Sequence, residues 1–218
     1  AYRPLRNAPR LAPLITAIGV SIVLQNVAMM IWGRQYIPFP DILPHEPIHL
    51  GAATFLPVQG VIVGLSGVLM IGLLLLVHHT RLGRAMRATA QAPSVARLMG
   101  VSVDRVIAST FVIGSVLAAV AGVMVTANYG QAHAYMGFML GLKAFSAAVL
   151  GGIGNLAGAV VGGLLLGLIE SLGAGYIGDV TGGFLGSQYQ DVFAFLVLIL
   201  VLVFRPSGLL GERLADRP

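Results

Sequence analysis

The 218-residue chain contains no cysteine and few charged residues. Without cysteine there is no disulfide framework, no thiol chemistry and no zinc site built from thiolates. Charged side chains make up 10% of the sequence, whereas hydrophobic residues make up 57%. Soluble domains have roughly 25% charged residues, so the composition predicts a membrane protein.

Nucleotide-binding sequences are missing as well, because no GxGxxG follows a predicted strand and GxxxxGK[ST] does not occur. Any ATP-driven activity of this chain therefore needs an ATPase on another polypeptide. The formal net charge of +5 does not indicate nucleic-acid binding, since the basic residues are divided among loops between apolar segments. No basic stripe is interleaved with aromatic residues in the manner of a nucleic-acid surface.

Long apolar runs divide the chain into segments. A membrane-spanning helix needs about 20 predominantly apolar residues, and these runs predict an all-α, polytopic transmembrane helical bundle in one domain, residues 1–218. The six predicted segments are residues 11–32, 57–79, 106–127, 138–152, 154–176 and 190–204. The fourth and the sixth are short, so they are expected to be tilted, re-entrant or incomplete spans.

The distribution of basic residues predicts an orientation. If residues 1–10 lie inside, six crossings also place the segments 80–105, 152–154 and 205–218 inside. These segments and residues 1–10 carry 11 of the 13 lysine and arginine residues. Because cytoplasmic loops retain basic residues, both chain ends and the 80–105 loop are predicted to be cytoplasmic.

The loop at residues 81–105 carries five arginines and one acid. Residues 82–90 are strong helix formers and are expected to extend the preceding span as a helix. Pro93 and Gly100 suit the start and the end of a second, short helix. The apolar face of that helix is formed by Val95, Leu98 and Met99. From these residues alone, docking into a groove of a cytoplasmic partner and resting on anionic lipid are both open interpretations.

Four colinear blocks cover nearly the whole chain: YRPLRNAPRLAPLITAIGVSIVLQN, GRAMRATAQAPSVARLMGVSVDRVI, GLKAFSAAVLGGIGNLAGAVVGGLLLGLIESLGAGY and FRPSGLLG. They resemble the branched-chain amino-acid permeases of bacterial ABC importers, the LivH/LivM family. The resemblance implies a non-catalytic, cofactor-free subunit of the bacterial inner membrane that transports branched-chain or related amino acids. Members of that family have further apolar helices before the first block, so the chain is expected to be an N-terminally truncated permease.

The resemblance also implies partners. These are two ABC ATPase subunits, a second permease subunit that is related or identical, a periplasmic substrate-binding protein, the amino acid and the lipid membrane. In the family the 81–105 loop is similar to the coupling element that contacts the ATPase. The residues that match this element are Arg84, Arg87, Ala88, Gln91, Ala96, Arg97, Leu98 and Gly100.

Glycines recur at helical spacing in the fifth predicted segment. A small residue at every fourth position lets two helix backbones approach closely in a membrane. The glycines expected to pack in this way are Gly154, Gly158, Gly162, Gly163 and Gly167.

Residues 45–49, HEPIH, match the HExxH signature of zinc proteases. That chemistry requires both histidines on one face of a regular helix. Pro44 and Pro47 disfavour such a helix because proline removes a backbone donor and clashes with the preceding turn. We therefore interpret the match as accidental and expect no metal.

Glu170 lies inside the fifth segment, where an ionised acid is costly and often functional. It is predicted either to contact substrate or to bond across helices, and Gln25, Asn26 and Asn128 have the same two interpretations. Lys143 is expected to extend its ammonium group toward the outer interface. Two alternatives to amino-acid import remain: an ABC permease for urea or short amides, and an ATP-independent secondary transporter in which Glu170 couples an ion.

Overall fold

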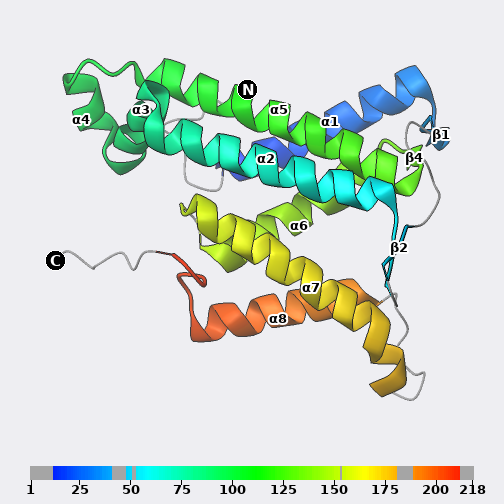
Figure 1. Ribbon diagram of the computed structural model, residues 1–218. Helices are drawn as coiled ribbons and strands as arrows, with labels where there is room; N and C mark the ends of the chain where they lie inside the picture. The colour runs from blue at the N-terminus through cyan, green and yellow to red at the C-terminus, as the bar shows by residue number, and fades with distance from the viewer. Residues whose placement is uncertain (1–11, 41–47, 51–52, 153, 181–188, 212–218) are drawn as a thin grey trace. The chain divides into compact units, whose positions relative to one another are not determined.

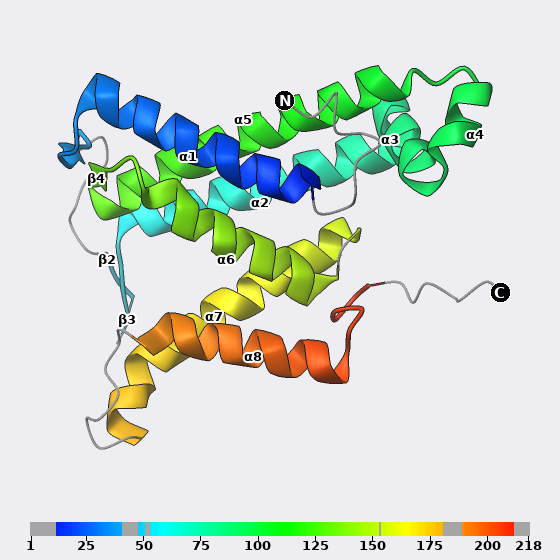
Figure 2. The ribbon, with the colours of Figure 1, turned by 180° about the vertical axis from the view of Figure 1, so that it is seen from behind.

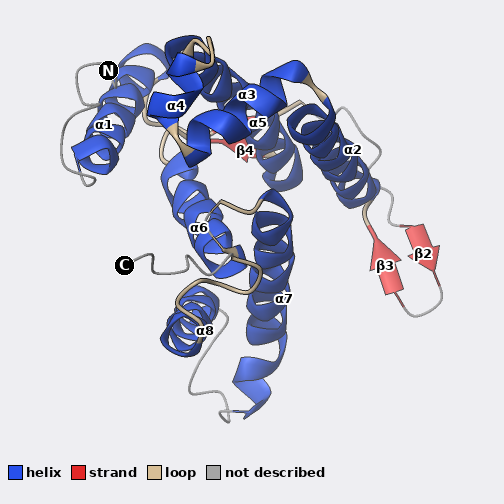
Figure 3. Cartoon of the chain, turned by 90° about the vertical axis from the view of Figure 1, so that its left-hand side faces the viewer, coloured by secondary structure: helices blue, strands red, loops and turns tan. Residues whose placement is uncertain are grey.

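The computed structural model describes residues 12–40, 48–50, 53–152, 154–180 and 189–211. These residues are mainly helical, which confirms the predicted all-α class, and two pairs of short strands join them (Figures 1 and 3). The backbone forms two compact units, Ala1–Phe138 and Met139–Pro218. The boundary between them lies in the first turn of a helix.

The elements follow one another along the chain as α1 (Ala12–Trp32), β1 (Ile37–Pro38), β2 (Ile48–Leu50), β3 (Ala53–Phe55), α2 (Pro57–His79), α3 (Arg81–Gln91), α4 (Pro93–Leu98), α5 (Val103–Tyr129), β4 (Gln131–Ala132), α6 (Met136–Gly151), α7 (Leu156–Val180) and α8 (Gln190–Phe204). All six predicted apolar segments are helices, and α2 and α8 have the predicted ends. The loop predicted between α1 and α2 also contains the strands β1, β2 and β3.

Four of the described helices, α1, α2, α5 and α7, are long and apolar enough to cross a membrane. Their mean hydropathy lies between 1.8 and 2.7, and α6 and α8 are apolar but shorter. Large apolar side chains stay exposed on these helices; Val63 of α2 is 73% exposed and Val112 of α5 is 63% exposed. Exposed apolar surface on this scale suits helices that are surrounded by lipid.

In the first unit, α2 and α5 lie side by side (Figure 1). The helices α3 and α4 contact α5 near its start, and β4 follows its end, where β1 pairs with β4 in antiparallel register. Gly130 ends α5 in the left-handed conformation, with φ +67°, which glycine adopts without steric cost. The helices α3 and α4 and the β1–β4 pair therefore lie at opposite ends of α5.

In the second unit, α7 and α8 lie side by side (Figure 2). Its core is small and is formed by Ala147 of α6, Leu166 of α7, Ala194 of α8 and Leu150, which is 1% exposed. Two of these four side chains are alanines. The connection between α6 and α7 turns at Gly152 and Gly154, both of which have positive φ.

Candidate functional site

A sharp bend separates α2 from α3. Thr80 is extended, with φ −95° and ψ 161°, and its hydroxyl donates to the carbonyl of Leu76 at 2.6 Å and accepts from the amide of Gly83 at 3.0 Å. A Cβ at Gly83 would collide with the carbonyl oxygens of Leu76 and Val77. The expected continuation of α2 as one helix is therefore wrong, because Thr80 caps a new helix that folds back onto the end of the old one.

The predicted short helix forms as expected. Pro93 occupies its first turn, where the missing amide needs no partner, and α4 ends at Leu98. Gly100 follows with φ +82°, and the amide of Val101 donates to the carbonyl of Ala96 at 3.0 Å. Ala96 itself is only 4% exposed. The buried alanine and the glycine turn hold α4 against the rest of the first unit.

The outer side of α4 presents an apolar tip, which we define as Val95, Leu98 and Met99. Leu98 is 86% exposed and Met99 is 79% exposed. Residues two apart on a helix face nearly opposite ways, so the buried Ala96 directs Leu98 outward. These three side chains thus form a hydrophobic surface that no other described part of the chain covers.

Exposed arginines lie on both helices of this element, and Arg97 precedes Leu98 in α4. Of the eight residues that match the coupling pattern, Ala96 is buried and the others are exposed. Arg87 donates to the carbonyl of His78 at 3.4 Å. A shallow hollow of about 530 Å³ runs from Arg97 to Asp104 beside the tip. The element therefore combines exposed apolar side chains, basic side chains and a concave margin.

The glycines of α7 differ in their surroundings. A Cβ at Gly158 would collide with the carbonyl of Gly151, and a Cβ at Gly162 would collide with the carbonyl of Ala147 and approach the amide of Gly151 to 2.7 Å. At Gly163 the nearest atom is the Cβ of Ala147 at an ordinary 3.8 Å. Gly158 and Gly162 are thus the positions at which α7 lies directly against the backbone of α6.

Two other predicted glycines, Gly154 and Gly167, have no other atom of the described chain within 4 Å of an added Cβ. The pattern also missed glycines outside α7. Gly152 and Gly208 approach one another, and a Cβ on Gly208 would lie 2.6 Å from the Cα of Gly152. Nothing in the spacing of the α7 glycines points to these positions, because they belong to turns.

Three of the polar residues predicted as candidates for a substrate path lie in the first unit. The side-chain nitrogen Nε2 of Gln25 donates to Ser21 Oγ at 3.1 Å, and Nδ2 of Asn26 donates to the carbonyl of Ile22 at 2.8 Å. Both bonds stay within one turn of α1. Asn128 is exposed in the last turn of α5. These two bonds of Gln25 and Asn26 stabilise α1 locally and do not bridge it to another helix.

Glu170 lies in the second unit and accepts a hydrogen bond of 3.0 Å from Nζ of Lys143. The same nitrogen lies 2.8 Å from Oδ1 of Asp191. Lys143 therefore joins acids from α7 and α8, and its extension toward the outer interface stays a prediction. We name Lys143, Glu170 and Asp191 the charge triad.

The HExxH match has no helical support in the described residues. His49 lies in the antiparallel strand pair β2–β3, opposite Thr54, while residues 41–47 lie outside the described part of the chain. Within the described ranges no three histidine or acidic side chains gather in a way that would hold a metal ion. His49 is therefore in an extended strand, whereas the zinc-protease signature requires its second histidine on a helix.

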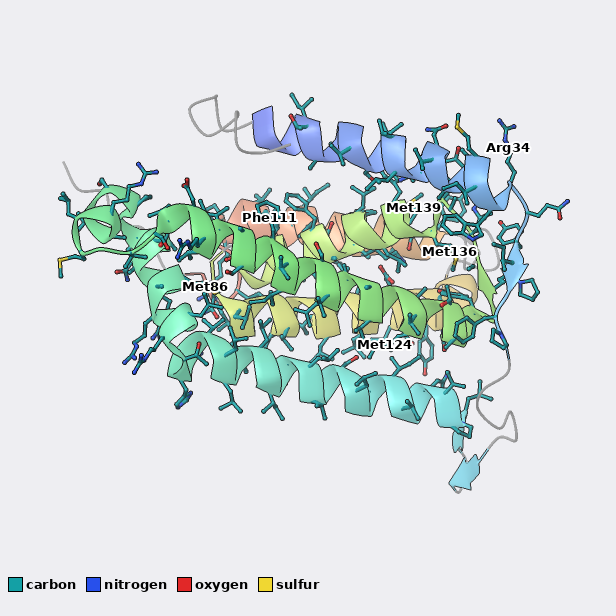
Figure 4. All side chains as sticks on the ribbon, turned by 90° about the horizontal axis from the view of Figure 1, so that it is seen from above. Arg34, Met86, Phe111, Met124, Met136 and Met139 are labelled. Carbon is teal, nitrogen blue, oxygen red and sulfur yellow. The ribbon has the colours of Figure 1, made fainter. Side chains whose placement is uncertain are left out.

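An aromatic cluster at the β1–β4 end of the first unit was not predicted. The ring of His133 lies 4.6 Å from that of Tyr36 and 5.5 Å from that of Tyr135, measured between centroids. A mainly apolar pocket of about 190 Å³ adjoins it, lined in part by Trp32 and Ile37. Figure 4 labels Arg34 at this end and Met86 of α3 at the other. Trp and Tyr are frequent at membrane–water boundaries, so the cluster suits a boundary position.

Comparison with known proteins is consistent with these features. The sequence matches the family described as branched-chain amino acid transport system / permease component over residues 3–202. It is 44% identical over 217 residues to the high-affinity branched-chain amino acid transport system permease protein LivH of Salmonella typhimurium, a match that covers 97% of this chain and 68% of the relative. The permease protein BraD of Pseudomonas aeruginosa is 46% identical over 216 residues, with the same coverage.

A more distant relative is the autoinducer 2 import system permease protein LsrC of Photorhabdus luminescens, 27% identical over 199 residues, which are 89% of this chain and 57% of the relative. No solved structure matches the chain significantly. The family match covers most of the sequence, and the apolar helices suit a protein that spans a membrane. The chain therefore belongs to the family of branched-chain amino acid transport permeases.

Proposed function

We propose that this chain is the membrane-spanning subunit of an ABC importer for branched-chain or related amino acids, driven by separate ATPase subunits. The observation that carries the proposal is the exposed apolar tip, on an element that also carries exposed arginines, in a chain without a P-loop sequence. An exposed apolar helix face fits a groove on a partner, and the arginines fit acidic side chains around that groove. The α3–α4 element is thus the proposed ATPase contact.

Burial of the tip would stabilise such a complex. Removing a fully exposed leucine side chain from water contributes about 1.5–3 kcal/mol, and Leu98 is 86% exposed. The alternative occupant is the lipid surface, which also accepts basic amphipathic helices. That alternative explains the arginines equally well, but α4 has only six residues and offers little area for lipid binding.

In the proposed mechanism, the importer alternates between states open to either side of the membrane. A substrate-binding protein delivers the amino acid on one side, and closure of the two ATPases displaces α3 and α4 on the other. The Thr80 bend ties α3 to the end of α2 by two hydrogen bonds, so displacement of α3 reaches a membrane-spanning helix directly. A second permease subunit, identical or related, would complete the pathway.

Branched-chain amino acids are the favoured substrates because the relatives at 44% and 46% identity are named for them, whereas the autoinducer 2 permease is 27% identical. Urea or a short amide is the second candidate. Secondary transport is less favoured, because Glu170, the residue predicted to couple an ion in such a transporter, is already bonded to Lys143.

The test uses the importer assembled in proteoliposomes, with its ATPases, partner permease and binding protein. We expect Leu98→Asp to weaken ATPase retention about tenfold or more, since loss of 1.5 kcal/mol corresponds to roughly that factor. Leu98→Met, which keeps an apolar side chain, is the matched control. Uptake of labelled leucine should fall with retention.

Charge is tested separately. Arg97→Glu should weaken ATPase binding, while Arg34→Glu makes the same charge change at the opposite end of the first unit and should leave it intact. Normal ATPase retention and leucine uptake in both Leu98→Asp and Arg97→Glu would reject the docking surface. Uptake of urea but not leucine would support the importer function and would show that urea, not a branched-chain amino acid, is the substrate.

A further inference from the structure

The charge triad joins the three helices of the second unit. Lys143 comes from α6, Glu170 from α7 and Asp191 from the first turn of α8. The side chains of Lys143 and Glu170 are 27% and 19% exposed, and that of Asp191 is 41% exposed. Among the described side chains of this unit, the other charged one is Arg205, at the end of α8. The triad thus gathers charge from all three helices at one place in an apolar unit.

A second set of contacts joins the same helices elsewhere. The amides of Leu209 and Leu210, beyond α8, donate to the carbonyls of Leu150 and Gly151 at 2.9 Å, and Asn155 Nδ2 donates to the carbonyl of Leu210 at 2.9 Å. We call these neutral contacts the turn clasp. Along α6, Lys143 precedes Gly151 by about 12 Å at the usual helical rise. The clasp holds the end of α8, whereas the triad holds its beginning.

The charges of the triad are unequal, since one cation faces two anions. Oδ1 of Asp191 lies within ion-pair distance of Lys143 but is not in hydrogen-bonding geometry. Attraction and repulsion are both stronger in apolar surroundings than in water. Without Lys143, two acids of neighbouring helices would remain together with no cation between them.

We infer that Lys143 is a shared counter-ion that positions the start of α8 against α6 and α7, and that its removal separates α8 from them more than the loss of either acid does. This inference does not depend on the proposed transport function, because it concerns the position of one helix. Lys143 is also the one lysine in the sequence. Its role is positional, and no substrate contact is assigned to it.

The test follows the burial of Ala194 on α8. Ala194 lies one turn after Asp191, is 2% exposed and contacts the core of the unit. Because the chain has no cysteine, Ala194→Cys provides a single thiol whose rate of reaction with a membrane-permeant maleimide reports its exposure. Ala96→Cys, in the first unit and 4% exposed, is the matched reporter for general unfolding.

We expect Lys143→Met to raise the labelling rate of the thiol at position 194 about tenfold and to leave the rate at position 96 unchanged. Asp191→Asn should raise the rate at position 194 less, because Lys143 and Glu170 then form a balanced pair. Adding Glu170→Gln and Asp191→Asn to Lys143→Met should return that rate toward its original value. Equal labelling in Lys143→Met and the parent, or a larger effect of Asp191→Asn, would overturn the inference.

Failure of the Lys143→Met protein to accumulate in membranes would be informative as well. The triple variant lacks the uncompensated acids, so it should accumulate if the two acids cause the failure. A triple variant that also fails to accumulate would overturn the inference. The exchange Lys143→Glu with Glu170→Lys keeps one cation between two acids and should retain slow labelling of the thiol at position 194.

Discussion

The contact between α6 and α7 allows a quantitative test at Gly162. Replacing Gly162 with alanine adds one methyl group that would meet the carbonyl of Ala147 and lie 2.7 Å from the amide and 3.0 Å from the Cα of Gly151. All three atoms belong to the backbone, so no side chain can rotate away. The two helices must move apart to accommodate the methyl group.

The magnitude follows from two opposing terms. Overpacking costs about 1–3 kcal/mol, and a contact made entirely with backbone belongs at the upper end of that range. Alanine is a better helix former than glycine by about 1 kcal/mol. We therefore expect Gly162→Ala to lower the free energy of unfolding by about 2 kcal/mol.

Gly167 supplies the matched control, because it lies in the same helix and an added Cβ meets no described atom within 4 Å. Gly167→Ala should retain only the helix-forming gain, about 1 kcal/mol. The two alanine variants should therefore differ by about 3 kcal/mol, or roughly a hundredfold in the folding equilibrium. Gly163→Ala, with one ordinary contact at 3.8 Å, should resemble Gly167→Ala.

The assay is unfolding in mixed micelles, with helix content followed by circular dichroism as the denaturing detergent fraction increases. Midpoint and slope together give the difference in free energy of unfolding between variants. The reasoning is refuted if Gly162→Ala is as stable as Gly167→Ala. A loss shared by Gly162→Ala and Gly163→Ala would also refute it, because it would show no dependence on the helix face.

Three further predictions concern the first unit. Gly83→Ala should open the bend after α2, since its methyl group would collide with the carbonyls of Leu76 and Val77, and protease should then cut between α2 and α3 faster than in the parent. Thr80→Val should lower thermal stability by about 1 kcal/mol through loss of the cap, and an unchanged melting curve would contradict this. His45→Ala combined with His49→Ala should leave transport unaffected, and a zinc-dependent loss of uptake would restore the metal interpretation.

The helices could be predicted because apolar length is a local property. The ends of α2 were correct because Pro57 starts the helix and the two histidines finish the apolar run. The continuous extension into α3 was wrong because it rested on helix propensity alone. Thr80 and Gly83 carried the missing signal, as threonine favours the position before a helix and glycine permits close approach.

Contacts between helices were harder to predict, because spacing identifies a face but not its neighbour. The pattern in α7 included Gly158 and Gly162, but it could not distinguish them from Gly167. Gly151, which both of them contact, belongs to another helix, and its part depends on how α6 turns into α7. The apolar tip of α4 was easier to predict. Once Pro93 gives the start of this six-residue helix, the helical repeat determines which side chains share a face.

The charge triad is a second set of contacts between helices that the sequence did not predict. Taken alone, Lys143 has only an interface as its explanation, and Glu170 has a substrate or a bond to a neighbouring helix that the sequence does not identify. The two residues are 27 positions apart, and Asp191 lies further along the chain on a third helix. Charges in an apolar segment are therefore better interpreted as a set, because an unpaired charge is costly and the nearest opposite charge on another helix is the first partner to test.

The arginines of α3 and α4 and the single lysine of the chain have different surroundings. The arginines of α3 and α4 are exposed, where their planar groups can bind acids of a partner with two hydrogen bonds each. The single lysine is enclosed by acids of its own unit, and its compact ammonium group reaches both Glu170 and Asp191. A cation that is already paired with acids of its own chain is less available to the acids of a partner than an exposed, unpaired one. Under the proposed function, the exposed arginines are the charges that contact the ATPase, and under the further inference the triad sets the position of α8.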